Sequence, residues 1–206
     1  MNNTLSSSSL VLASGNAGKI REFEALLPQY TLLTQNHFAV PDVAETGLTF
    51  VENALLKARN AARYAQLPAL ADDSGLVVHA LNDAPGIYSA RYAGQGADDA
   101  QNIDKLLHAL EGVPTHARHA YFFCVLVFLR HAEDPCPLIA QGRWDGVILT
   151  QAKGEFGFGY DPIFGVPSHH CSAAQLPPAI KNSLSHRAKA LDQLKTLLTS
   201  NTALRV

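Results

Sequence analysis

The sequence lacks the features that mark several classes of protein. Its three cysteines are an odd number, lie far apart and include no C-x-x-C pair, so they predict neither a disulfide framework nor a zinc site. Acidic residues outnumber basic ones, 18 to 16, which argues against a surface built to hold DNA or RNA backbone. No hydrophobic run approaches membrane-spanning length. We therefore expect a cytoplasmic protein that binds neither a nucleic-acid polymer nor a membrane.

The N-terminus also lacks the pattern of a secretion signal. The first basic residue is Lys19, and the serine run at 6–9 precedes only a short apolar stretch. We expect residues 1–9 to be a polar tail. Hydrophobic residues make up 47% of the chain and charged residues 17%, which is a globular composition. Residues 10–206 are therefore expected to form a single two-lobed domain.

The spacing of apolar residues predicts an α/β fold. Helical spacing marks residues 19–27, 49–65, 98–110 and 185–198, and apolar or alternating runs predict strands at 10–13, 69–71, 76–78, 117–129, 138–144 and 146–150. Crossover and hairpin connections are both present, which predicts a mixed central sheet with flanking helices, in two lobes around an active-site cleft. We expect the acidic run 72–75 on a turn, and a glycine-rich loop over 154–165.

A glycine turn leads into the first predicted helix. Its residues are Ser14, Gly15, Asn16, Ala17, Gly18 and Lys19. Backbone N–H groups and the positive end of a helix dipole attract phosphate at such a turn, and the lysine adds a full charge. It is not a Walker A loop, because Ala13 and Ile20 replace the first glycine and the final Ser or Thr. A phosphate-binding turn and an ordinary strand-to-helix turn explain the segment equally well.

The acidic run Asp72-Asp73-Ser74-Gly75 could form a metal centre with Glu45, near Glu52. Magnesium prefers hard oxygen ligands and is usually held by one or two carboxylates, waters and substrate phosphates. One such carboxylate can also take a proton from an attacking water. An isolated D-D-S-G is better explained as a solvated turn, so the metal interpretation depends on the rest of the chain.

Two further segments could contact a nucleotide. The loop over 154–162 interleaves glycines with aromatics, which can stack on a base, although aromatics that fold back onto the core explain it slightly better. Lys181 and the run Ser185-His186-Arg187 stand at the start of the last helix, where donors can bind phosphate or the carbonyl edge of a base. A serine cap followed by exposed basic residues is the alternative.

Taken in order, these segments resemble the inosine triphosphate pyrophosphatase family, also described as XTP/dITP diphosphatases. The motifs that carry the resemblance are Ser-Gly-Asn-Ala-Gly-Lys at 14–19, Glu-Thr-Gly-Leu-Thr-Phe at 45–50, Ala-Asp-Asp-Ser-Gly-Leu at 71–76, Pro-Gly-Ile-Tyr-Ser-Ala-Arg at 85–91, Phe-Gly-Tyr-Asp-Pro at 158–162 and Ser-His-Arg at 185–187. The match runs from residue 10 to residue 198. Each motif is weak alone, whereas the ordered set is specific.

The resemblance implies a homodimeric, Mg²⁺-dependent hydrolase. Its substrates would be deaminated (6-keto) purine nucleoside triphosphates (ITP, dITP and XTP), and its products the monophosphate and pyrophosphate. Asp73 is implied as the catalytic proton acceptor and a magnesium ligand, and Glu45 as a second ligand; the choice of Asp73 over Asp72 rests on the resemblance alone. The residues implied to bind substrate are Ser14, Gly15, Asn16, Ala17, Gly18, Lys19, Lys57, Ser74, Phe158, Gly159, Tyr160, Asp161, Lys181, His186 and Arg187.

Selectivity follows from the donors that His186 and Arg187 would present to the six-position of the purine. A carbonyl there can accept hydrogen bonds from these donors, whereas the amino group of adenine is itself a donor and leaves them unpaired. The stretch 174–180 departs from the family pattern, so we expect altered helix structure there without lost chemistry. Two other functions remain open: a noncatalytic nucleotide sensor that uses the same residues, and a phosphatase that releases orthophosphate.

Overall fold

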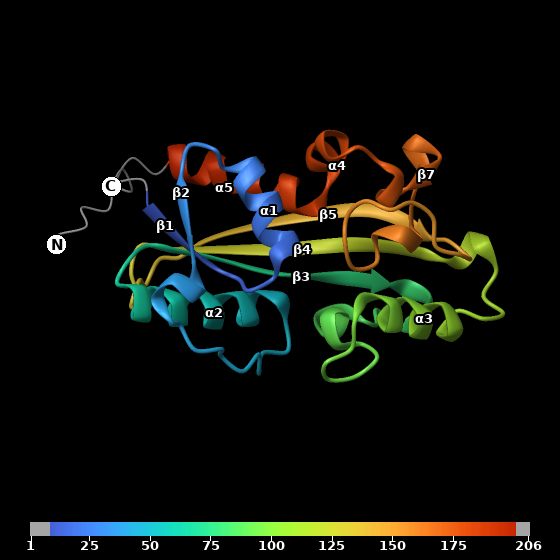
Figure 1. The fold of residues 1–206 in the computed structure, drawn as a ribbon, viewed down its shortest axis with the longest axis horizontal. Helices are drawn as coiled ribbons and strands as arrows, with labels where there is room; N and C mark the ends of the chain where they lie inside the picture. The colour runs from blue at the N-terminus through green and yellow to red at the C-terminus, as the bar shows by residue number, and fades with distance from the viewer. Residues whose placement is uncertain (1–8, 201–206) are drawn as a thin grey trace. The chain divides into compact units, whose positions relative to one another are not determined.

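The computed structural model describes residues 9–200, which form an α/β fold (Figure 1). The strands are β1 (Ser9–Ala13), β2 (Thr31–Thr34), β3 (Ala69–Val78), β4 (His119–Leu129), β5 (Leu138–Ile148), β6 (Phe164–Val166) and β7 (Cys171–Ser172). The α-helices are α1 (Ala17–Leu26), α2 (Phe50–Ala65), α3 (Asp99–Ala109), α4 (Pro178–Leu184) and α5 (His186–Ser200). Short 3₁₀ helices cover Gln35–Phe38, His79–Leu81, Gly86–Arg91, Thr115–Ala117, Asp161–Ile163, Pro167–His169 and Ala173–Gln175.

The strands form one seven-stranded sheet in the order β2-β1-β3-β4-β5-β6-β7. β1 is parallel to β2 and β3, while β6 is antiparallel to β5 and β7. The sheet is therefore mixed and flanked by helices, as the sequence predicted. The chain divides into two compact units, unit 1 (1–73, 125–141 and 190–206) and unit 2 (74–124 and 142–189). That residues 10–206 act as one two-lobed domain stays a prediction.

Unit 1 places the acidic run at the reversal of strand order. Because α1 leads from β1 to β2 and α2 leads toward β3 on the other side of β1, right-handed crossovers put the two helices on opposite faces (Figure 1). Ala13 pairs with Ala71, so β3 continues past the end of β1 with Asp72 and Asp73. Ligands of open α/β sheets bind beyond the carboxyl ends of strands where the order reverses.

Unit 2 is built around an aromatic core. The Phe122 ring lies 4.5 Å from the Phe164 ring and 6.3 Å from the Trp144 ring, measured between centroids. On α3, the side chains of Ile103 and Leu106 are buried in the same core. A buried hydroxyl group ties two segments together, since the Tyr160 hydroxyl donates to the Ser89 carbonyl at 2.8 Å. Packing therefore fixes the C-terminal end of the predicted glycine-rich loop.

The prediction that residues 72–75 lie on a turn is wrong. β3 is one continuous strand from Ala69 to Val78, and both aspartates lie inside it, buried. Turn statistics for Asp and Ser reflect solvated carboxylates, whereas these two meet lysine ammonium groups that offset the cost of burial. The local sequence contains neither lysine, so it could not reveal the strand.

Other boundaries differ from the prediction by smaller amounts. The strands predicted at 138–144 and 146–150 are one strand, because Asp145 faces solvent and pairs with Arg143 on the same face, 2.7 Å apart. The loop predicted over 154–165 ends early, since β6 begins at Phe164. Ser9 opens β1, and residues 1–8 of the predicted tail lie outside the described residues. β2 and α4 were not predicted, and α4 falls in the stretch where altered helix structure was expected.

Within residues 9–200, no helix is both long and apolar enough to cross a membrane. Cys124, Cys136 and Cys171 are free thiols, and Cys124 is buried.

Candidate active site

Five charged side chains of unit 1 meet where β1 ends and β3 continues. We call them the acidic cluster: Lys19, Glu45, Lys57, Asp72 and Asp73. Lys19 pairs with Asp72, while the Lys57 ammonium lies 2.6 Å from Asp73 Oδ1 and 3.0 Å from Glu45 Oε1. Successive side chains of a strand point to opposite faces, which explains why the two aspartates meet lysines from the two helices, α1 and α2. The structure thus brings together the residues predicted at 19, 45, 57 and 73.

The two aspartates differ in what their carboxylates contact. The side chain of Asp72 is fully buried and pairs with Lys19. Asp73 uses Oδ1 for Lys57, and its Oδ2 is buried without a hydrogen-bond partner among residues 9–200. Burial raises the pKa of Asp73 against the opposing effect of Lys57 and Lys19. An enclosed carboxylate with a raised pKa and a spare oxygen has the properties of a general base.

Lys57 is held in its charged form by the same carboxylates. Burial alone would lower the pKa of Lys57, but the charges of Asp73 and Glu45 outweigh burial and raise it. One ammonium group thus bridges two carboxylates and stays cationic. A site where Asp73 and Glu45 already share one positive charge suits a cation bound by oxygen ligands.

The acidic cluster fits magnesium by its donor set. Hard carboxylate oxygens are the ligands magnesium prefers, and the buried Oδ2 of Asp73 is an acceptor without a hydrogen-bond partner in the part of the chain that the structure describes. The part of the chain that the structure describes contains no group of three or more His, Cys, Asp or Glu side chains suited to a metal. A metal here would therefore draw on one or two carboxylates, with water and phosphate oxygens completing its shell.

The glycine turn after β1 is an N-terminal helix cap. Asn16 caps α1, and its Oδ1 accepts the Lys19 N–H at 3.0 Å. The Asn16 N–H in turn donates to Ser14 Oγ at 3.2 Å. Gly15, Asn16 and Ala17 are exposed and Gly18 is buried inside the helix. The turn therefore presents the N-terminus of α1 beside Lys19, although local side chains already accept two of its amide protons.

A buried asparagine fixes the segment that carries Glu45, and sequence reasoning missed it. Asn53 on α2 is fully buried, and its Oδ1 accepts the Gly47 N–H at 2.8 Å. A Cβ on Gly47 would lie 2.7 Å from that oxygen. The preceding residue, Glu52, accepts the Leu48 N–H at 2.9 Å, and its own N–H donates to Oγ1 of Thr49, the N-cap of α2. An asparagine amid the apolar positions of α2 was the available signal.

The second set of predicted residues lies in unit 2. We call it the aromatic cluster: Ser74, Phe158, Asp161, Lys181, His186 and Arg187. Asp161 Oδ2 accepts from Lys181 Nζ at 2.5 Å and from the Phe158 N–H at 2.9 Å. Both members of this ion pair are buried. The Phe158 ring is half-buried, with Lys181 Nζ 4.9 Å from its centroid. The structure thus joins Ser74 to Arg187, which is 113 positions away in sequence.

The basic residues that open α5 are inside the protein. Arg187 is buried, its Nη2 donates to Ser74 Oγ at 3.0 Å, and its Cζ lies 5.7 Å from the Phe158 ring centroid. His186 is buried against Phe122, with ring centroids 4.8 Å apart and planes 15° apart. The alternative of exposed basic residues behind a serine cap is therefore wrong for these two, although Ser185 Oγ does accept the Ala188 N–H. Phe122 was not predicted, because its partner is distant in sequence.

The aromatics of the glycine-rich loop behave differently from one another. Tyr160 is buried and folds onto the core, and burial raises its pKa well above the usual range. Phe158 is half-buried, and Phe156 is 56% exposed. The interpretation that the aromatics fold back onto the core therefore holds for Tyr160 and leaves the ring of Phe158 partly available to a ligand.

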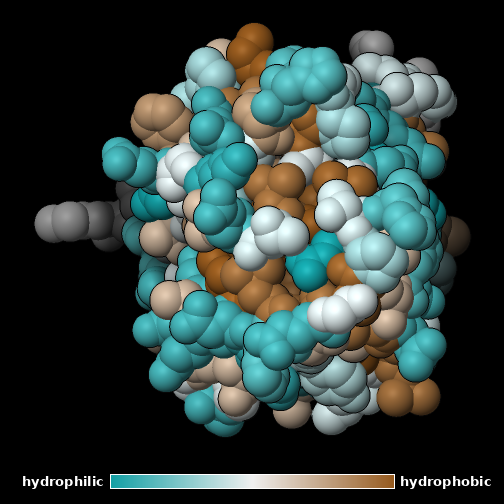
Figure 2. Space-filling model, turned by 90° about the vertical axis from the view of Figure 1, so that its right-hand side faces the viewer, coloured by the Kyte–Doolittle hydropathy of each residue, from teal (hydrophilic) through white to brown (hydrophobic). Residues whose placement is uncertain are grey.

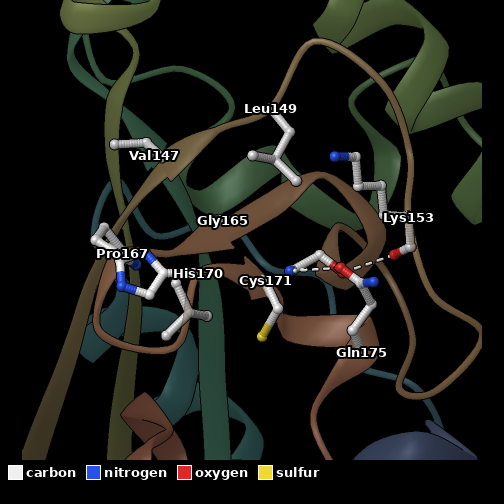
Figure 3. Close-up of a pocket in the computed structure, with 10 residues that line it drawn as sticks. Val147, Leu149, Lys153, Gly165, Pro167, His170, Cys171 and Gln175 are labelled. Carbon is white, nitrogen blue, oxygen red and sulfur yellow. Dashed lines mark hydrogen bonds between the residues drawn. The ribbon is translucent and has the colours of Figure 1, made fainter.

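Unit 2 contains a pocket of about 200 Å³, and none of its lining residues is a predicted site residue (Figure 3). Its lining residues are Val147, Leu149, Lys153, Gly165, Val166, Pro167, His170, Cys171, Ser172 and Gln175. Ser172 closes one wall by donating its hydroxyl to the Lys153 carbonyl at 2.6 Å. The side shown in Figure 2 also gathers hydrophobic side chains in a hollow rimmed by hydrophilic ones. The pocket lining mixes apolar side chains with polar ones, among them Lys153 and Gln175.

The chain is similar to known proteins of one family. The family model of the Ham1 family matches residues 10–197. A dITP/XTP pyrophosphatase of Vibrio parahaemolyticus is 57% identical over 196 residues, which cover 94% of this chain and 98% of that protein. The corresponding Salmonella typhimurium protein is 57% identical over 187 residues, which cover 90% of this chain and 95% of that protein.

Solved structures give the same result. A HAM1 protein from Coxiella burnetii superposes with a TM-score of 0.86 at 52% identity and covers 93% of this chain and 98% of its own. The Staphylococcus aureus Ham1 protein has a TM-score of 0.83 at 42% identity, with 94% and 100% covered. Both the resemblance drawn from the motifs and the mixed α/β architecture are thereby confirmed, and the chain belongs to the Ham1 family.

Proposed function

We propose that the chain hydrolyses deaminated purine nucleoside triphosphates (dITP, ITP and XTP) to the monophosphate and pyrophosphate. The observation that carries this proposal is the acidic cluster, in which the buried Oδ2 of Asp73 has no hydrogen-bond partner among the described residues, close to Lys57 on α2 and to Lys19 in the first turn of α1. The names of the relatives at 57% identity, dITP/XTP pyrophosphatases, support the substrate class.

The acidic cluster supplies the chemistry at phosphorus. Asp73 Oδ2 accepts a proton from a water molecule as the water oxygen bonds to the α-phosphorus and the bond from that phosphorus to the oxygen bridging to the β-phosphate breaks. Pyrophosphate is then the leaving group. Burial raises the pKa of Asp73, which makes its carboxylate a stronger base than an exposed one. Lys19 and Lys57 lie where they can offset charge on the phosphates, with the α1 turn as a further donor.

Magnesium would be held by Asp73 and Glu45, together with phosphate oxygens. When bound, it would lower the pKa of a coordinated water and neutralise phosphate charge. Lys57 lies within hydrogen-bonding distance of both carboxylates, so it keeps them close together before the metal binds.

The aromatic cluster would bind the base. Phe158 offers a half-buried ring for stacking, which is worth about 1–3 kcal/mol per base. Lys181, His186 and Arg187 are held by an ion pair, a ring stack and a hydrogen bond, so the donors are fixed before the base arrives. Fixed donors favour a six-position carbonyl over the amino group of adenine.

We further propose that the enzyme is a cytoplasmic homodimer. The dimer follows from the family resemblance, and the cytoplasmic location follows from the cysteine pattern. Light scattering of the purified chain tests the dimer, and cell fractionation tests the location.

A nucleotide panel tests the proposed function. The purified chain is incubated with dITP, ITP, XTP, dGTP and ATP, with and without magnesium, and both pyrophosphate and orthophosphate are measured. We expect pyrophosphate from dITP, ITP and XTP but not from ATP, and only with magnesium. Because guanine also carries a six-position carbonyl, dGTP tests whether that carbonyl alone is enough for turnover. Orthophosphate release would indicate the broader phosphatase, tight binding without hydrolysis would indicate the sensor, and equal turnover of ATP would contradict the selectivity.

A further inference from the structure

Two carboxylates hold the backbone on either side of the Phe158 ring. The Phe158 N–H donates to Asp161 Oδ2 at 2.9 Å, and the Gly159 N–H donates to Asp99 Oδ2 at 2.7 Å. Gly157 and Gly159 adopt φ angles of +81° and +59°, a region that L side chains rarely occupy. The glycines let the loop turn sharply, and the carboxylates fix where it turns.

The two carboxylates belong to different parts of unit 2. Asp161 is buried and only three residues from Phe158, so it acts within the loop. Asp99 is exposed, lies sixty residues away and is the first residue of α3. Asp99 is thus the link between the loop and a helix anchored in the core by Ile103 and Leu106.

Helix capping does not account for Asp99. Asp98 is the N-cap of α3, and it forms a reciprocal capping box with Gln101, accepting the Gln101 N–H at 2.8 Å. The Asp99 carboxylate gains from the positive end of the helix dipole, but its hydrogen bond goes to Gly159. The carboxylate is therefore directed at the loop.

We infer that Asp99 is a positioning residue for the purine base. This rests on the proposed function, in which Phe158 stacks on that base. The ring lies 4.9 Å from Lys181 Nζ and 5.7 Å from Arg187 Cζ, so a small shift of the loop changes how far the stacking surface stands from the donors that read the six-position carbonyl. Asp99 holds that spacing through the Gly159 amide. It touches neither the base nor the reacting phosphate.

Three variants of the full-length chain test the inference. Asp99→Ala removes the acceptor, Asp99→Asn keeps a carbonyl oxygen in its place, and Asp104→Ala is the matched control, an exposed aspartate on the same helix. For dITP hydrolysis we expect KM to rise by about tenfold in Asp99→Ala with kcat within about twofold, the size of one hydrogen bond to a charged group. Asp99→Asn should recover most of the affinity, and Asp104→Ala should match the wild type.

Urea unfolding of the same variants separates positioning from folding. Alanine is tolerated at an exposed first helical turn, so the midpoint should move little. An unchanged KM in Asp99→Ala would overturn the inference, as would an equal rise in Asp104→Ala or a loss of kcat that follows the loss of stability.

The inference can fail separately from the proposed function. If the wild type releases no pyrophosphate, the proposed function is wrong, and calorimetric binding of inosine monophosphate then decides the inference. Weaker binding by Asp99→Ala than by wild type and Asp104→Ala supports it. Equal binding, or none to the wild type, overturns it.

Discussion

The acidic cluster of unit 1 and the aromatic cluster of unit 2 bury carboxylates in opposite ways. In the acidic cluster, Asp73 Oδ1 accepts a hydrogen bond from Lys57, whereas Asp73 Oδ2 has no hydrogen-bond partner among the described residues. In the aromatic cluster, Asp161 accepts from Lys181 and from a backbone N–H, and both members of the pair are buried. Asp73 shares the ammonium group of Lys57 with Glu45, whereas Asp161 pairs with Lys181.

This difference separates reactive from organising carboxylates. A buried carboxylate without enough donors has a raised pKa and can accept a proton or a cation, as at Asp73. A carboxylate supplied with donors fixes its surroundings, as Asp161 fixes Phe158 and Lys181. The motif D-D-S-G and the motif F-G-Y-D-P each contain aspartate, but only the contacts distinguish the two roles.

The largest effect is expected for Asp73→Asn. Loss of the proton acceptor should lower kcat by about 10³-fold, within the usual contribution of general base catalysis. Stability should change little, because Lys57 retains Glu45 as a partner. Pyrophosphate release and urea unfolding measure the two quantities. Asp72→Asn, which leaves Lys19 beside a neutral amide, is the comparison variant. Full activity in Asp73→Asn would contradict the role of Asp73 as the proton acceptor.

Asp161→Asn should act on stability. It replaces the buried carboxylate that pairs with Lys181 by a neutral amide, which costs about 3 kcal/mol or more of unfolding free energy. The matched control is Asp145→Asn, because the pair of Asp145 with Arg143 is exposed and should contribute about 1 kcal/mol or less. Urea unfolding measures both. Equal losses in the two variants would show that the aromatic cluster does not depend on its buried pair.

Gly47→Ala should disturb the acidic cluster without touching a carboxylate. The added Cβ would lie 2.5 Å from Glu52 Cβ and 2.7 Å from Asn53 Oδ1, and overpacking of this kind costs about 1–3 kcal/mol. Because Gly47 is two residues from Glu45, we expect a higher magnesium requirement and a smaller shift of the melting temperature by magnesium. Gly15→Ala is the control for stability, since its nearest neighbour is 3.6 Å away. A normal magnesium response in Gly47→Ala would contradict the role of the Glu45 segment.

Asp134→Asn tests, on a third carboxylate, whether the number of hydrogen-bond donors around a buried carboxylate sets its role. Asp134 accepts from the Arg130 side chain and from the Arg130 and Cys136 N–H groups, and these bonds lower its pKa far below the usual value. A lowered folded-state pKa stabilises the protein above the unfolded pKa of about 4 and loses that contribution as the pH falls toward the folded pKa.

We expect the free energy of unfolding to fall less steeply in acid for Asp134→Asn than for the wild type. At pH 7 the variant should lose about 1 kcal/mol, a low figure because solvent screens the arginine. The difference from wild type should shrink below pH 4, as urea unfolding at several pH values would show. A difference that grows in acid would contradict a lowered pKa of Asp134 in the folded protein.

Much of the fold was predictable because the evidence for it is local. The helical spacing of α2 and its N-cap Thr49 lie within one stretch, and the structure begins and ends that helix within one residue of the prediction. β1 and α3 were equally close. Strand β3 was misread because Asp and Ser favour turns locally, and only lysines from distant helices make a buried acidic strand tolerable.

The candidate site divides in the same way. The sequence by itself determined the inventory: the acidic run, Glu45, the lysines, the aromatic loop and the basic start of α5, together with the family to which they belong. Tertiary structure decided what each group does, because its partners lie far along the chain, as Lys19 does from Asp72 and Gly159 does from Asp99. Whether a buried carboxylate keeps a spare oxygen depends on how many donors the fold brings to it, and no local pattern of residues encodes that number.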